Sequence, residues 1–485
     1  MFLKLAGFAP DTDQMNPGVI TDLANMVPSM KGYKGAPSPV DQGVVSLSGT
    51  CVGAAVLRLT DDTARFIAGT PSNLFERQGS SWTSRAEGTY ALGADDRWRF
   101  LQNGDVTLAV TKQVVMQAYQ GTGGASFSTV TGAPQAAVGD VVLDFVMVGN
   151  TNEASFSESP QRVMWSGAGN YAQWTPRNAT TQAGTDNLTD IPGGITALKT
   201  LGDQAVVYKN RGIHLGTYEG PPFIWTFQTI PGTVGTPCQE AVVNVGFAHI
   251  FFGYEGIYIF DGVRPQRIST DIDEFIFVTR LDRQYAHRIS HIHDRGNSRI
   301  YWFYPRTGGS GALNGSVVLN YRNMRWGVDD RTIGIGIEFI SGQTTIDGLD
   351  ALASTIDTLP DIPFDSPFWS QYSTLPAYIG SNGKVYVLNG AAGASVIETG
   401  DYGQDNVISL VSRVRPRFAT TPSSASLTHK YRDQLGQSTT STSVDMSSGK
   451  FDALVSSRWH RERMACSGSA EVYGFDVDIE ADGEE

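Results

Sequence analysis

The sequence predicts an all-β protein built around a β-propeller of about six to seven blades. The first observation is composition: 54 glycines accompany 18 tyrosines, 23 phenylalanines and 9 tryptophans in 485 residues, a mixture typical of short strands joined by tight turns. The second is a recurring unit in which two β-rich runs flank a glycine turn, which indicates a hairpin. The third is spacing, because the clearest neighbouring units lie about 40 to 45 residues apart, the length of a four-stranded blade.

The hairpin units are found along most of the chain. The clearest run from Ala205 to Gly216, from His249 to Gly262 and from Ala377 to Gly390, and weaker ones surround Asn103-Gly104, Gly296 and Val317 to Trp326. A blade cannot bury both of its faces alone, so blades stack radially and the apolar alternation of each strand becomes the core between blades. A long antiparallel sandwich is the alternative fold. The spacing places the blades near residues 45–90, 91–133, 135–192, 194–236, 238–285, 286–335 and 336–400.

Two segments fall outside this repeat. Residues 1–44, rich in Pro and Gly, are expected to form an extended N-terminal arm whose removal would leave the propeller folded. Residues 407–485 are expected to form a small C-terminal β-domain with a flexible Ser/Thr-rich loop from Ser438 to Ser448 and a final strand from Val472 to Ile479. The propeller therefore spans residues 45–406, with a Pro-rich loop insertion near 357–369.

Charge and targeting signals restrict the class of protein. The formal net charge is −13, and the acidic tail from Glu471 to Glu485 holds seven acids and no base. An acidic total disfavours a protein that grips nucleic acid, because phosphate affinity comes mainly from Lys and Arg. We expect neither a signal peptide nor a membrane span. The three cysteines, at wide spacing, match neither a disulfide framework nor a zinc pattern.

The usual signatures of enzymes are missing from the sequence. It contains no nucleophile elbow, no phosphate-binding loop and no dinucleotide fingerprint in the expected context, so we predict no enzymatic activity and no cofactor. His287, His291 and His293 form the one dense cluster of metal-ligand types. We interpret it as a polar strand edge that runs into a turn from Asp294 to Ser298, and expect no metal dependence of folding. A glycosidase would need two carboxylates about 5 to 10 Å apart, which sequence alone cannot pair.

Basic residues gather in one region, between Val411 and Arg463. This surface is a candidate docking face for an acidic partner; a solvated face is the plainer interpretation, and DNA binding is disfavoured because few aromatics are interleaved. The candidate partner-docking residues are Arg413, Arg415, Arg417, Arg458, Arg461 and Arg463.

Several segments, taken in their order along the chain, resemble the tail nozzle (tail tubular) proteins of short-tailed bacteriophages, a family that includes the packaged-DNA stabilisation proteins. No single segment is specific to this family, and the resemblance depends on the order of the segments along the chain. The segments are Asn25 to Ser29 with Lys31 to Ser38, Tyr208 to Gly216 followed by Phe223-Ile-Trp225, Gly253 to Gly262, Val317 to Trp326, and Tyr473 to Asp478.

The resemblance implies a structural virion protein, assembled in the host cytoplasm, with no catalytic residues. Its members form a hexameric ring below the portal and its adaptor, make the distal tail tube, carry fibres or spikes, and hold a plug or needle that retains packaged DNA. Double-stranded DNA would then pass through the lumen without specific binding, and no nucleotide ligand is implied. Two other functions stay open: a glycan-binding or glycan-degrading propeller of a phage tail, and a cellular propeller scaffold.

Overall fold

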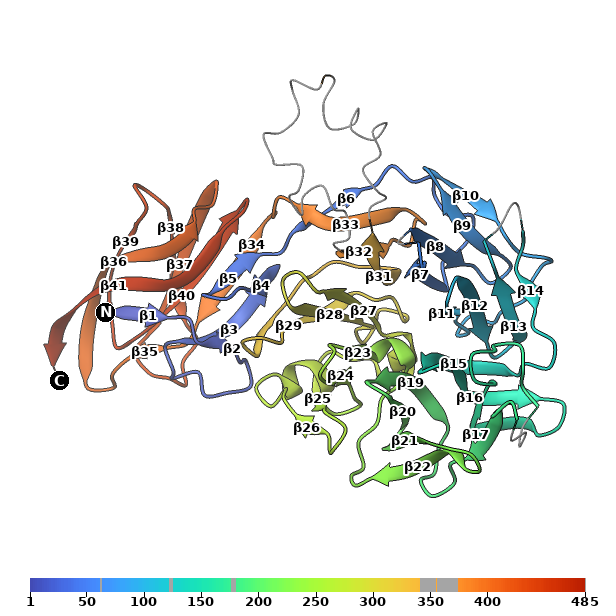
Figure 1. The fold of residues 1–485 in the computed structure, drawn as a ribbon. Helices are drawn as coiled ribbons and strands as arrows, with labels where there is room; N and C mark the ends of the chain where they lie inside the picture. The colour runs from blue at the N-terminus through green and yellow to red at the C-terminus, as the bar shows by residue number, and fades with distance from the viewer. Residues whose placement is uncertain (62, 122–124, 176–179, 341–354, 356–373, 485) are drawn as a thin grey trace.

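A computed structural model describes the chain except for residues 62, 122–124, 176–179, 341–354, 356–373 and 485. The described residues form seven four-stranded antiparallel sheets around an axis and, beside them, a β-domain of two sheets that contains both termini (Figure 1). The first strands of neighbouring blades contact one another around most of the ring, and residues Gln239–Ala241, before the fifth blade, contact the first strand of the sixth. The predicted β-propeller is therefore confirmed, with seven blades, and the alternative of a long sandwich is wrong for this part of the chain.

The strands of the first six blades follow one another in the sequence. The first three blades are β7 (Gly53–Arg58), β8 (Ala64–Gly69), β9 (Leu74–Gln78) and β10 (Ser81–Ser84); β11 (Arg99–Asn103), β12 (Val106–Thr111), β13 (Val114–Tyr119) and β14 (Ser128–Thr129); and β15 (Gln135–Val142), β16 (Phe145–Glu153), β17 (Ser157–Trp165) and β18 (Gly184–Asn187). The next three are β19 (Ile195–Leu201), β20 (Gln204–Lys209), β21 (Gly212–Gly220) and β22 (Ile224–Ile230); β23 (Val242–Asn244), β24 (His249–Phe252), β25 (Ile257–Phe260) and β26 (Gln266–Arg267); and β27 (Ser290–Asp294), β28 (Arg299–Tyr304), β29 (Gly315–Asn320) and β30 (Arg325–Gly327). Each of these six sheets lies inside one predicted blade interval.

The seventh blade takes its outer strand from the other end of the chain. It comprises β31 (Ile335–Ile340), β32 (Thr374–Ile379), β33 (Val385–Gly390) and β6 (Ser38–Asp41). In the register of β33 with β6, Val387 lies opposite Val40 and Leu388 opposite Pro39. An outer strand tolerates Pro39 because its missing N–H is not needed by a further neighbour. The N-terminal segment thus closes the ring between the first and last blades.

The expected extended arm is wrong, because the N-terminal strands belong to the β-domain. One sheet has the order β39 (Phe451–Ser457), β36 (Val407–Thr420), β41 (Glu471–Glu484), β5 (Tyr33–Gly35) and β4 (Met26–Pro28), with β1 (Phe2–Lys4) pairing with β41. The other has the order β2 (Gly7–Phe8), β3 (Val19–Ala24), β34 (Ser395–Thr399), β40 (Trp459–Ser467), β37 (Ser424–Arg432) and β38 (Thr440–Asp445), with β35 (Tyr402–Gly403) pairing with β40. Strands this short form only through partners distant in sequence, so local pattern does not reveal them.

Two smaller expectations in the C-terminal region are also settled by strand pairing. The expected Ser/Thr-rich loop is instead an edge strand, β38, whose exposed hydroxyl-bearing residues pair with β37. The expected final strand is present and is longer, because β41 pairs along most of β36. The Pro-rich insertion near 357–369 lies outside the described residues.

A single apolar core joins the β-domain to the propeller. Phe475 and Val477 of β41, Leu427 of β37, and Trp302 and Leu319 of the sixth blade belong to one cluster of buried side chains. Only three short helical turns accompany the strands in the described part of the chain: η1 (Gln239–Ala241), η2 (Glu274–Val278) and η3 (Arg283–Arg288). None of the helices among these residues is long and apolar enough to cross a membrane.

Candidate functional site

The candidate docking residues do not form one free basic surface. Arg413, Arg415 and Arg417 lie on β36, whereas Arg461 and Arg463 lie on β40 in the other sheet of the β-domain. Arg458 lies between β39 and β40. The structure therefore divides the predicted cluster into two groups, each with its own acidic partners.

The β36 group is paired largely with the acidic tail. Arg413 Nε lies 2.9 Å from Asp452 Oδ1, Arg415 Nη2 lies 3.7 Å from Asp478 Oδ2, and Arg417 is paired with Asp476. These three arginines remain 35%, 41% and 48% exposed. Exposed ion pairs of this kind contribute only about 0 to 1 kcal/mol, so an acidic partner could exchange with them. Docking through this group stays a prediction.

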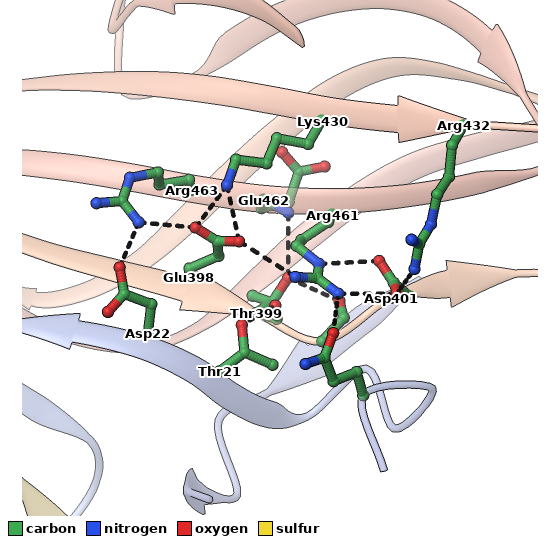
Figure 2. Close-up of polar contacts among 12 residues, drawn as sticks. Thr21, Asp22, Glu398, Thr399, Asp401, Lys430, Arg432, Arg461, Glu462 and Arg463 are labelled. Atoms are coloured by element: carbon green, nitrogen blue, oxygen red, sulfur yellow. Dashed lines mark hydrogen bonds and ion pairs between the residues drawn. The ribbon is translucent and has the colours of Figure 1, made fainter. Parts of the chain in front are cut away.

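The β40 group takes part in a buried charge network (Figure 2). Glu398 accepts hydrogen bonds from Lys430 at 2.8 Å and Arg463 at 2.7 Å, and Asp401 accepts two from Arg461, both at 2.8 Å. The Glu398 and Asp401 side chains are only 5% and 3% exposed. Removing one member would leave a buried charge without its partner. This group therefore stabilises the β-domain, which makes it a poorer docking face than the β36 group.

The opposite face of β40 holds a second polar chain, inside the β-domain. Glu462 accepts from Tyr402 and lies 2.8 Å from His429 Nδ1, while His429 Nε2 lies 3.0 Å from His460 Nδ1. His460 Nε2 lies 3.1 Å from the carbonyl of Ser409. His429, His460 and Glu462 are fully buried.

The hydrogen-bond partners of these side chains determine where the protons lie. A carbonyl oxygen can only accept, so His460 Nε2 carries a hydrogen and its Nδ1 accepts from His429 Nε2. His429 Nδ1 and Glu462 must then share one further proton, because two lone pairs cannot face each other at this distance. This hydrogen-bonded series of groups is buried and neutralised internally. It could not be found from the sequence, because its members come from four separate strands, β35, β36, β37 and β40.

The propeller encloses a central channel. A cavity of about 830 Å³ is lined by the first strands of the blades and by the loops that precede them. That volume lies within the roughly 300 to 1,000 Å³ usual for small-molecule pockets. The cavity therefore has the size of a site for a small molecule.

Ion pairs between distant blades cross the channel. Arg99 of β11 contacts Glu240, next to the fifth blade, with Nη2 and Oε2 2.8 Å apart. Asp95, before the second blade, accepts from Arg288, before the sixth, at 2.7 Å. Contacts from His287 and Arg288 lower the pKa of Asp95 to about 2. These links tie opposite sides of the ring together.

The histidine cluster flanks this channel. His291 and His293 lie on β27, the first strand of the sixth blade, as predicted, but His287 lies in η3 and contacts Asp95. His291 Nδ1 lies 2.6 Å from the carbonyl of Glu240, and burial lowers its pKa to about 4. Within the described ranges, no three His, Cys, Asp or Glu residues are arranged to hold a metal ion.

Most of the charged residues of the channel could not be found from the sequence. Arg97, Arg99, Asp140, Lys199 and Glu240 come from four different blades and lie far apart in the chain. The one signal that could have found them is a charged residue at or just before the first strand of a blade, because these strands line the axis.

Comparisons with known proteins identify no family. No protein-family model and no curated protein matches the sequence. Solved structures that are similar include one titled for the mitotic checkpoint complex (8% identity, 75% of this chain and 98% of that chain, TM-score 0.41), the WD40 domain of Pan2 from Neurospora crassa (8%, 75% and 96%, TM-score 0.40) and the AfRom2 CNH domain (10%, 72% and 98%, TM-score 0.38). The fold class rests on the sheets described above.

Proposed function

We propose that this chain is a non-enzymatic structural subunit of the tail nozzle of a short-tailed bacteriophage. In this proposal it forms the distal tail tube as a ring, hexameric by resemblance, below the portal and adaptor. The ring carries fibres or spikes, helps a plug retain packaged DNA, and provides the conduit for DNA ejection. Its place is the virion.

The observation that carries the proposal is the convergence of three family-like segments at one junction. Tyr33, from the segment Lys31 to Ser38, donates its hydroxyl to the carbonyl of Trp326, from the segment Val317 to Trp326, at 2.9 Å. Tyr33 also lies opposite Val472, directly before the segment Tyr473 to Asp478. Segments that seem unrelated in sequence thus meet where the β-domain packs on the sixth blade, which supports reading their order as one shared architecture.

The central channel of the propeller affects which path DNA could take through such a ring. Ion pairs cross the channel of the propeller, so the proposed conduit for DNA is the lumen between subunits. A chain of net charge −13 fits a lumen that releases DNA quickly, because affinity for phosphate comes mainly from Lys and Arg.

A glycan-degrading propeller has less support. Among the carboxylates that line the channel, Glu240 is paired with Arg99, Glu338 is paired with Arg295, and Asp140 accepts two backbone N–H groups. None stands as a free acid and base pair of the kind that glycoside hydrolysis needs.

Electron microscopy of the purified chain, alone and with the portal and adaptor of the same phage, tests the proposal. We expect six-fold rings, at least in the presence of the adaptor. Particles that stay monomeric under both conditions would contradict it.

The docking role of β36 is tested in the same assay by neutral substitutions, since glutamates would also repel Asp452, Asp476 and Asp478. The triple variant Arg413→Gln, Arg415→Gln, Arg417→Gln should fold and lose ring assembly or adaptor binding. A matched control changes the same amount of charge at exposed arginines of the propeller: Arg211→Gln, Arg264→Gln and Arg283→Gln. Equal assembly by the two triple variants would remove the docking face from the proposal.

A further inference from the structure

The propeller channel carries positive charge that the protein does not balance. Four cationic side chains and three carboxylates line it. Arg99 is paired with Glu240, Arg288 with Asp95, and Glu338 with Arg295. After these pairings Arg97 and Lys199 remain, against the single carboxylate of Asp140. Burial raises the pKa of Asp140, but Lys199 and two backbone N–H groups favour its charged form, so the lining keeps one net positive charge.

The two remaining cations have few partners of their own. Arg97 donates from Nη1 to the carbonyls of Ala94 at 3.1 Å and Asp96 at 2.8 Å, and makes no contact with a carboxylate. Burial, together with Arg99 nearby, lowers the pKa of Arg97. Lys199 forms no hydrogen bond or ion pair within the described part of the chain, although it lines the cavity. A desolvated cation is costly unless an anion accompanies it.

Arg99 adds an independent sign of a missing acceptor. Its side chain is only 10% exposed, and its Nε is buried without a hydrogen-bond partner. A donor of this kind in a cavity wall is free to bind a water or a ligand oxygen. A guanidinium presents its donors in a planar fork that matches the oxygens of a phosphate.

We propose that the channel binds a small phosphate-bearing molecule in the space bordered by Arg97, Arg99 and Lys199. The surplus positive charge and the guanidinium donors of Arg97 and Arg99 favour an anion with several oxygens, such as a phosphate monoester of charge about −1.5 to −2 at neutral pH. The cavity is larger than phosphate alone requires, so an organic group has room beside it. This inference goes beyond the nozzle proposal and does not depend on ring assembly.

Isothermal titration calorimetry on the purified full chain, in a buffer free of phosphate and sulfate, tests the site. Inorganic phosphate and phenyl phosphate are the probes, and acetate is the singly charged comparison. We expect saturable binding of both phosphates at one site per chain, and at least ten-fold weaker binding of acetate. Binding of a short oligonucleotide without binding of either phosphate would overturn the proposal in favour of a polymer surface.

Two substitutions locate the site. Lys199→Met and Arg97→Met should each weaken phosphate binding at least ten-fold, and the exposed Lys31→Met serves as the matched control that should bind like wild type. Lys199→Met removes no hydrogen bond, so it should fold, which circular dichroism can check. The inference is wrong if neither phosphate binds at millimolar concentration, or if Lys199→Met binds like Lys31→Met.

Discussion

Tyr33 offers a sharp test of the junction between the β-domain and the propeller. Its hydroxyl accepts the backbone N–H of Phe8 at 2.8 Å and donates to the carbonyl of Trp326 at 2.9 Å. Tyr33 is fully buried, and Phe8 and Trp326 are 1% and 3% exposed. The substitution Tyr33→Phe keeps the ring and removes only the oxygen. It therefore isolates the contribution of two buried hydrogen bonds that join three distant segments.

The cost follows from the groups left behind. A buried donor or acceptor without a partner costs about 1 to 3 kcal/mol. Tyr33→Phe leaves the N–H of Phe8 without its acceptor and removes one hydrogen bond from the carbonyl of Trp326. We therefore expect a loss of about 2 to 4 kcal/mol in unfolding free energy. Urea denaturation followed by tryptophan fluorescence measures it, read from the transition that includes the β-domain.

Tyr301 supplies a matched control. It is also fully buried, on β28, but its hydroxyl has no hydrogen-bond partner among the described residues. Removing a buried polar group that is unsatisfied should be neutral or stabilising. If Tyr33→Phe and Tyr301→Phe changed the unfolding free energy by the same amount, the hydrogen bonds of Tyr33 would not hold the junction and this reasoning would fail.

Three further predictions concern acid, the buried proton chain and the N-terminal strands. Burial lowers the pKa of His249, His291 and His460 from 6.5 to about 4. All three bind protons more readily when unfolded, so stability should be complete above pH 6.5 and fall toward pH 4, by about 3 kcal/mol per histidine. A flat unfolding free energy between pH 7 and 5 would contradict this. His429→Leu leaves Glu462 with Tyr402 as its side-chain donor and removes the donor to His460 Nδ1, so it should cost about 3 to 5 kcal/mol. Glu462→Gln should cost distinctly less, and equal losses in thermal denaturation would refute the shared proton. Deleting residues 1–41 should abolish folding of the β-domain and open the seventh blade, seen as rapid proteolysis of both; a compact, protease-resistant product would restore the idea of a removable arm.

Features that depend on neighbours in the chain could be predicted from the sequence. Period-2 alternation and glycine turns defined hairpins such as β20 with β21 and β24 with β25, because both strands and the turn lie within one short segment. Repetition of that unit then placed six of the seven blades in their intervals. The final strand was visible for the same reason, since Val472 to Ile479 alternates along its length.

Tertiary structure alone decided which distant residues became partners. Nothing local in Ser38–Asp41 shows that it completes the seventh blade, because the hydrogen bonds that make it a strand come from β33. The same holds for charge: Arg417 and Asp476 look like parts of a basic cluster and an acidic tail until β36 and β41 pair and bring them together. Strand pairing and ion pairing act between residues that are distant in sequence. Only the folded chain therefore reveals that Arg461 and Arg463 are paired with buried acids, and that the channel keeps a surplus of positive charge.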